Sequence, residues 1–242
     1  MEIIWLRPGS METFLRLNQG KGVLVVSLNP HINPSDRKYH DRSFSADEWW
    51  NYWREFNLFP SNWSRQFFPR LVKLAAMSLG EEIPTAQNDI HQFATNRMLF
   101  VEFCPHASAG FAGLSWHQWK NVANDEPGFR IKRQVRQLIF DYGQPAMVFC
   151  NGQAAAFDVK DQQFGVHNMA NLKLSIPEEQ NHSMEVYSAT YKPQLGRPFP
   201  VIGFNQLGRT ASSPNIEMEI IRRHILRLGL KEQVIAEPGG PV

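Results

Sequence analysis

The sequence predicts an α/β fold: a single domain with a central four-stranded parallel sheet and helices on both of its faces. Four short runs rich in valine, isoleucine and phenylalanine are typical of strands that are covered on both faces. Segments of helical periodicity separate these runs, and this alternation favours right-handed crossovers between parallel strands. No internal repeat or composition shift divides the 242 residues, a length that suits one large core.

The four predicted strands follow one another at wide intervals. They are residues 22–28 (GVLVVSL), 97–104 (RMLFVEFC), 146–150 (AMVFC) and 199–204 (FPVIGF). Each interval is long enough for the crossover connection that parallel neighbours require.

Helical patterns are predicted at 45–56, 62–80, 129–143 and 214–229. The first begins with a capping box formed by Ser45 and Glu48. The second contains Pro69, which predicts a break or kink because proline lacks the N–H that an interior turn needs. The last starts at Pro214 and is expected to stop at Gly229.

Two of these helices are amphipathic, which predicts the face that each one buries. The helix at 129–143 is expected to bury Ile131, Val135, Leu138 and Ile139 and to turn away Lys132, Arg133 and Arg136. The helix at 214–229 is expected to bury Met218, Ile221, Ile225 and Leu228 and to turn away Arg222, Arg223 and Arg227.

Two further segments complete the predicted organisation. Residues 168–192 predict an inserted β-hairpin around the turn sequence PEEQNHS. Residues 230–242, which end in EPGGPV, predict a flexible tail. The folded domain is therefore expected to span residues 1–229.

Composition restricts the partners and the compartment. The formal net charge of +2 and the pI near 8.6 permit a polyanionic partner without requiring one. No window reaches 18 uninterrupted apolar residues, so no membrane helix is expected. The N-terminus lacks the features of a secretion signal, and Cys104 and Cys150 lie in apolar runs that predict buried free thiols. These features favour the reducing cytoplasm.

Polar or glycine-bearing segments follow all four predicted strands. They are Asn29-Pro30, Glu102 to His106, Asn151-Gly152 and Phe204 to Arg209. Because ligands of open parallel sheets bind beyond the carboxyl ends of the strands, we expect these segments to form one crevice. Each segment taken alone is also typical of an ordinary turn at the end of a strand. The prediction of a crevice therefore depends on the four segments lying together.

Several other chemistries lack their motifs. The chain has no Gly-x-Gly-x-x-Gly or Gly-x-x-x-x-Gly-Lys phosphate loop and no Gly-x-Ser-x-Gly nucleophile turn. The eight histidines show no metal-ligand spacing, and two cysteines cannot form a four-thiolate site. We therefore expect no metal and no cofactor.

Four motifs, taken in order, resemble those of the uracil-DNA glycosylase superfamily. SLNP at 27–30 resembles the Gly-x-Asn-Pro-like end of that family's first strand, and VEFCPH at 101–106 resembles its base-reading second strand end. MVFCNGQAAAF at 147–157 is similar to its third strand and following helix start, and GFNQLGRTASSPN at 203–215 stands where its DNA-wedging loop lies. Phe44 is placed like its stacking phenylalanine, and the resemblance extends over roughly residues 20 to 229.

The resemblance implies a uracil-DNA-glycosylase-like fold and a DNA glycosylase that flips out one nucleotide and leaves an abasic site. No lysine is evident in the four segments, so a monofunctional enzyme is expected. The implied catalytic residues are Asn29, which would orient the attacking water, and Asn205, with Asp36 or Asp41 as a possible base. The implied base-binding residues are Glu102, Phe44, Pro30, His106 and Asn151. The implied DNA-binding residues are Leu207, as an exposed wedge, and Gly208, Arg209, Thr210, Ser212 and Ser213 at the phosphates.

Two departures from the family pattern shape the expected substrate. Many members have asparagine where this chain has Glu102, and a carboxylate accepts from the amine of cytosine but opposes the carbonyl oxygens of uracil. We therefore expect a modified cytosine, hydroxymethylated or glucosylated as in some phage DNAs, and a role in antiviral defence. Adenine presents a similar edge and stays open as the target base.

Asn205 stands where the family usually has histidine, which favours a second hypothesis in which the same fold binds DNA without catalysis. Two further hypotheses stay open, namely repair of uracil or a damaged base and action on free nucleosides. The expected partner is DNA, held by its backbone and one extruded base. The protein is expected to act as a monomer and away from membranes.

Overall fold

The computed structural model describes residues 21–27, 67–102, 127–179, 181–205, 207 and 214–235 of this chain. The predicted helix at 45–56, with its capping box, and the residues after 235 lie outside the described residues.

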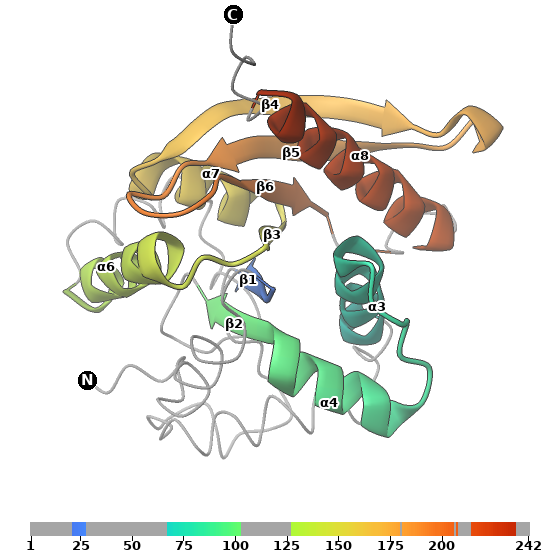
Figure 1. The fold of residues 1–242 in the computed structure, drawn as a ribbon, viewed down its shortest axis with the longest axis horizontal. Helices are drawn as coiled ribbons and strands as arrows, with labels where there is room; N and C mark the ends of the chain where they lie inside the picture. The colour runs from blue at the N-terminus through green and yellow to red at the C-terminus, as the bar shows by residue number, and fades with distance from the viewer. Residues whose placement is uncertain are drawn as a thin grey trace, which may run out of the picture.

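The centre of the structure is one six-stranded sheet in the order β2-β1-β3-β6-β5-β4 (Figure 1). Its parallel strands are β1 (Val23–Ser27), β2 (Met98–Glu102), β3 (Met147–Asn151) and β6 (Phe199–Phe204). These four strands confirm the runs predicted from the sequence. Their buried aliphatic residues match strands that are covered on both faces.

The sheet is wider than predicted because the hairpin joins it. Strands β4 (Val166–Ser175) and β5 (Ser183–Tyr191) pair antiparallel, with the short helix η3 (Pro177–Glu179) near their turn. β5 then pairs antiparallel with β6, which satisfies the backbone groups along that edge of the parallel strands. A four-stranded, wholly parallel sheet is therefore wrong, and the sheet is mixed.

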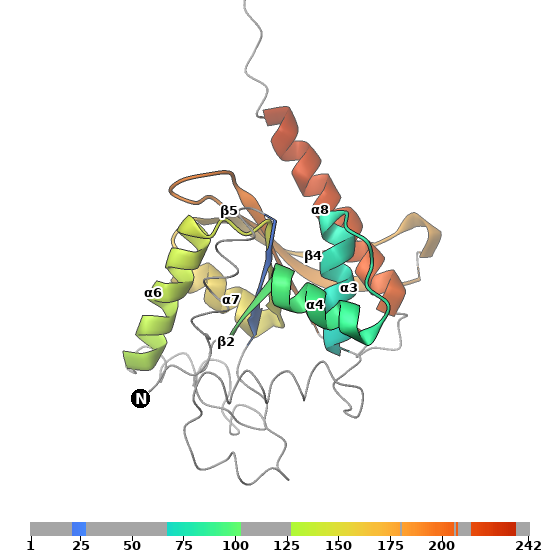
Figure 2. The same cartoon turned by 60° about the horizontal axis from the view of Figure 1, so that its bottom comes forward.

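Helices cover both faces of the sheet, as predicted. One face carries α3 (Phe67–Leu79), α4 (Gln87–Arg97) and α8 (Pro214–Ile235), and the other carries α6 (Pro127–Tyr142) and α7 (Gln153–Gln162) (Figure 2). Successive strand residues point to opposite faces, so Val23 and Val25 pack with the first group while Leu24 and Val26 pack with the second. The two cores lie on either side of β1.

The close approach of α7 to the sheet depends on Gly203 in β6. A Cβ atom at this position would lie 2.6 Å from the Cβ of Ala156 in α7. Two small residues therefore let the helix and the strand meet backbone to backbone.

The buried face of α6 differs from the prediction. Arg136, expected on the outer face, is 2% exposed, while Leu138, expected in the core, is 55% exposed. The helix is turned so that Arg136 meets Asp158 of α7, and Ile139 and Phe140 supply its apolar contact with the sheet. Hydrophobic periodicity misplaced this face because it treats every arginine as an outer residue.

One helix boundary also differs from the prediction, and another lies outside the described residues. The predicted start of the second helix at 62 lies outside the described residues, and α3 is described from Phe67 through Pro69 to Leu79. The helix α8 continues through Gly229 to Ile235, beyond the expected end of the folded domain. An interior glycine costs a helix only about 1 kcal/mol, which the packing of Met218, Ile221 and Ile225 offsets.

Candidate functional site

The direction of the chain reverses between β1 and β3. From β1 the chain crosses to β2 on one side, and from β2 it returns to β3 on the other side. In open α/β sheets such a reversal leaves a crevice at the carboxyl ends of the two central strands. The predicted segments at Asn29 and Asn151 follow these two strands.

The carboxyl ends of the four parallel strands lie in one row. Ser27 of β1 is paired in register with Glu102 of β2, and Asn151 of β3 with Phe204 of β6. Val26 pairs with Cys150, so the two pairs are neighbours in the sheet. The four segments predicted to converge therefore leave the sheet from one line across its edge.

Asn151 and Gly152 form the turn from β3 into α7. Gly152 has a φ of 96°, which a side chain rarely tolerates, although no atom lies within 4 Å of where its Cβ would be. Its N–H donates to the carbonyl oxygen of Phe204 at 2.8 Å, so this turn is tied to the end of β6. No side chain caps α7, whose N-terminus begins beside the row. The positive end of the helix dipole therefore lies at this edge.

The chain after β6 begins with an exposed residue and is then anchored. Asn205 is exposed directly beyond Phe204. Leu207 is only 2% exposed, and its side chain belongs to the core cluster that includes Leu71 of α3 and Met218 of α8. The prediction that Leu207 is an exposed side chain is therefore wrong, because this side chain is buried in the core.

Arg70 is a residue that the sequence analysis missed. It belongs to α3, and its Nη1 donates to the carbonyl oxygen of Leu207 at 3.2 Å. No local signal marked it, because Arg70 lies in the middle of the helix predicted at 62–80 and its acceptor is 137 residues away in the sequence.

A second missed feature lies behind the row, between α6 and α7. Arg136 forms a buried ion pair with Asp158 and donates a second hydrogen bond from Nε to Oε1 of Gln163. Cys150 of β3 is buried nearby. Burial raises the pKa of its thiol to about 12, with Arg136 opposing and Asp158 adding to this shift. The thiol therefore stays protonated at neutral pH and is no nucleophile.

Most of the other predicted site residues lie outside the described residues. These are Asn29, Pro30, Asp36, Asp41, Phe44, His106, Gly208, Arg209, Thr210, Ser212 and Ser213. Glu102 is described as the last residue of β2, by its backbone alone. Their roles remain predictions.

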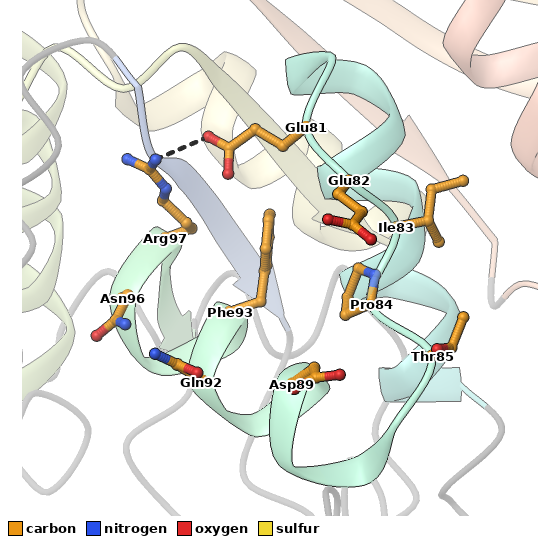
Figure 3. Close-up of a pocket in the computed structure, with 10 residues that line it drawn as sticks. All are labelled: Glu81, Glu82, Ile83, Pro84, Thr85, Asp89, Gln92, Phe93, Asn96 and Arg97. Carbon is orange, nitrogen blue, oxygen red and sulfur yellow. Dashed lines mark ion pairs between the residues drawn. The ribbon is translucent and has the colours of Figure 1, made fainter.

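Two pockets open away from the row. One, of about 420 Å³, lies between the 81–85 segment and α4 (Figure 3). Figure 3 shows Phe93 between these two segments and the ion pair of Arg97 with Glu81, whose nearest atoms are 2.9 Å apart. Arg97 directly precedes β2, so this pocket is at the amino end of the strands, opposite the candidate site. The other, of about 620 Å³, lies between α6 and the end of α7 and includes Leu138 and Phe164.

Neither a metal site nor a membrane helix is found in the described ranges. Across them, no three His, Cys, Asp or Glu side chains are grouped closely enough to hold a metal ion. Within the same part of the chain, every helix is too short or too polar to cross a membrane.

Two comparisons with known protein sequences find no match for this chain. No protein-family model matches it, and no curated protein sequence matches it either. The uracil-DNA glycosylase resemblance therefore rests on the sequence motifs alone.

Proposed function

We propose that this protein is a monofunctional DNA glycosylase, which flips one base out of DNA, hydrolyses its N-glycosidic bond and leaves an abasic site. One observation carries the proposal. The strand ends Glu102, Ser27, Asn151 and Phe204 form a single row at the reversal of the sheet. Each of the four glycosylase-like segments begins at this row, where α/β sheets bind their ligands.

Asn29 would orient the attacking water. It follows Ser27 by two residues, which keeps it near the row. An amide does not titrate, so it can align a water by hydrogen bonding but cannot remove its proton. Asp36 or Asp41 would accept that proton, as positive charge develops on the sugar and negative charge on the departing base.

The departing base needs a positive or hydrogen-bonding environment. Asn205, exposed beside Phe204, would donate one hydrogen bond to it but cannot carry a charge as histidine can. The uncapped N-terminus of α7 at Gly152 supplies further positive potential at the same edge. Dipoles that are already oriented stabilise developing charge without reorganisation, so they would supply part of what histidine supplies elsewhere.

Glu102 points to a modified cytosine as the excised base. As a carboxylate, Glu102 would accept a hydrogen bond from the exocyclic amine, and as an acid it would also donate to the ring nitrogen. Removal of ordinary cytosine would destroy the cell's own genome. Hydroxymethylated or glucosylated cytosine of phage DNA therefore fits the site, and the protein would act in antiviral defence.

The segment before α8 would hold the DNA backbone. Arg209 and the hydroxyl groups of Thr210, Ser212 and Ser213 would contact phosphates, helped by N–H groups at the start of α8. Binding of this kind releases counterions, so affinity should fall as salt rises. No wedge is assigned to Leu207, because its side chain is buried.

In a second candidate function, the protein binds DNA without catalysing removal of a base. The exposed Asn205 favours it, since the leaving base then lacks a charged partner. The deciding experiment is a gel assay for abasic sites on DNAs that differ at one position. This position carries hydroxymethylcytosine, glucosylated hydroxymethylcytosine, uracil or, as the unmodified control, cytosine. The glycosylase proposal expects cleavage after alkali on the modified-cytosine DNA. Binding without cleavage on every DNA would favour the second function.

A further inference from the structure

A single hydrogen bond joins two distant parts of the chain at the candidate site. Nη1 of Arg70 donates to the carbonyl oxygen of Leu207 at 3.2 Å, across 137 residues of sequence. Arg70 lies in α3, the first described element after β1, and Leu207 lies just beyond β6. The contact therefore connects α3 to the chain just beyond the last parallel strand.

The hydrogen bond to Leu207 has a charged donor. Arg70 is part of the described α3, and its guanidinium donates to the carbonyl oxygen of Leu207. Hydrogen bonds from a charged donor are stronger than those between neutral groups, so this one can hold the chain after β6 in place.

Leu207 is held at two points. Its side chain is buried in the core cluster that also contains Leu71 of α3 and Met218 of α8, and its carbonyl oxygen accepts a hydrogen bond from Arg70. Phe204 is fixed within the sheet by its pairing with Asn151. Asn205 lies between these two fixed residues, so the anchor at Leu207 limits where its exposed side chain can go.

We infer that Arg70 is a positioning residue, which holds the chain after β6 against α3 and thereby sets Asn205 at the carboxyl edge of the sheet. This inference rests on the proposed function for its catalytic consequence. Its structural part, the anchoring of Leu207, stands without any assumption about activity. Arg70 acts through Leu207 and Asn205, so it need not touch the DNA or the base.

The test compares Arg70→Met and Arg70→Lys with Arg97→Met. Arg97 is a suitable control because it is also a partly exposed helical arginine in a polar contact, but at the opposite edge of the sheet. Methyl NMR of Leu207 measures the anchor directly, with Ile225 in the same core as the internal reference. Turnover and DNA affinity, measured separately on the modified-cytosine DNA, report the catalytic consequence.

The anchor predicts a graded response. In Arg70→Met the Leu207 methyl signals should move toward the values of an exposed leucine, while those of Ile225 stay unchanged. Turnover should fall by roughly 10²-fold, as expected for a misplaced group, while the Kd for DNA changes less than about threefold. Arg70→Lys should lie between Arg70→Met and the wild type, because lysine still donates to a carbonyl oxygen. Arg97→Met should match the wild type in every measurement.

The outcomes separate the two proposals. Unchanged Leu207 signals in a folded Arg70→Met would overturn the inference, and so would equal effects on turnover and binding. If Arg70→Met does not fold, the Leu207 signals of Arg70→Lys decide in the same way. If the wild type forms no abasic sites on any DNA but the Leu207 signals still move, the glycosylase function fails and the anchor holds.

Discussion

Arg136 of α6 and Asp158 of α7 form an ion pair whose side chains are only 3% and 2% exposed. Gln163, just after α7, accepts a further hydrogen bond from Arg136 and donates one to the carbonyl oxygen of Arg133. The pair thus fixes α6 against α7 on one face of the sheet. Charges so deeply buried depend on each other, because neither can be hydrated once its partner is lost.

Removal of one partner should destabilise the fold strongly. We expect Asp158→Ala to lower the free energy of unfolding by about 3–5 kcal/mol, since it leaves the Arg136 guanidinium buried and unpaired. Urea unfolding at neutral pH measures the loss. A double variant, Arg136→Met with Asp158→Leu, should recover most of it because both charges are gone.

The exposed pair of Arg223 with Glu178 is the matched control for this prediction. Its nearest atoms are 2.9 Å apart at the surface, and Arg223 also pairs with Glu219. Because these side chains stay partly hydrated, Arg223→Ala should lower the free energy of unfolding far less than Asp158→Ala does. Equal losses of unfolding free energy in Asp158→Ala and Arg223→Ala would show that burial does not increase the contribution of the Arg136–Asp158 pair.

Glu219 in α8 should make stability depend on acid pH. Its carboxylate accepts hydrogen bonds from Arg222 and Arg223, and the bond from Arg222 is the main cause that lowers the pKa of Glu219 from 4.5 to about 2. A carboxyl group whose pKa is lower in the folded state stabilises the protein above its unfolded pKa. That stabilisation is lost as the pH falls from about 4.5 toward 2.

The corresponding test is the stability of Glu219→Gln over this pH range. At pH 7 the variant should be less stable than the wild type by about 1 kcal/mol, because partial exposure and salt screen the network. The difference should shrink toward zero as the pH approaches 2. Glu82→Gln, an exposed change in another part of the chain, controls for the loss of one carboxylate. A difference that stays constant from pH 7 to pH 2 would contradict the linkage.

Asn29→Ala should separate catalysis from turn formation. If Asn29 orients the water, turnover should fall by about 10²–10³-fold, while DNA affinity and melting temperature stay close to those of the wild type. Single-turnover kinetics and thermal unfolding measure the two effects. A variant that loses stability but keeps its specific activity would assign Asn29 to the turn alone.

Glu102→Asn should change the preferred base. An amide both donates and accepts, so it suits the edge of uracil better than a carboxylate does. The wild type should discriminate against uracil by about 10⁴-fold, and the variant should shift toward uracil and lose activity on modified cytosine. Paired abasic-site assays on the two DNAs measure this ratio, with Glu82→Gln as the control. Efficient removal of uracil by the wild type would refute the assignment of Glu102.

The sequence predicted the strands well because their physical signal is local. Val23 to Val26 form a continuous β-branched and leucine run, which only a strand covered on both faces accommodates easily. The hairpin was also visible, since alternating residues flank a polar turn. The sequence did not predict that the hairpin pairs with β6, because the pairing of Val186 with Phe204 joins residues that are distant in the sequence.

The errors in side-chain placement concern residues whose burial depends on a distant partner. Arg136 was assigned to the surface because its ion-pair partner, Asp158, is on another helix. One signal was available, since Asp158 lies among the buried apolar residues Ala155 and Val159 of α7. Leu207 was assigned to the surface because glycine and polar residues follow it in the sequence. It is buried in a core cluster with residues of α3 and α8, which are distant from it in the sequence or separated from it by residues of no helical pattern.

The contact between Gly203 and Ala156 has a consequence for how this protein can evolve. A larger residue at either position would push α7 off β6, so this part of the molecule tolerates little drift. The turn at Gly152 is hydrogen-bonded to Phe204 of the same strand, β6. A change that moved α7 would therefore also move the ends of β3 and β6. New substrate preferences would therefore arise in the segments beyond the strands, which can vary in length and sequence while the frame beneath them stays constant.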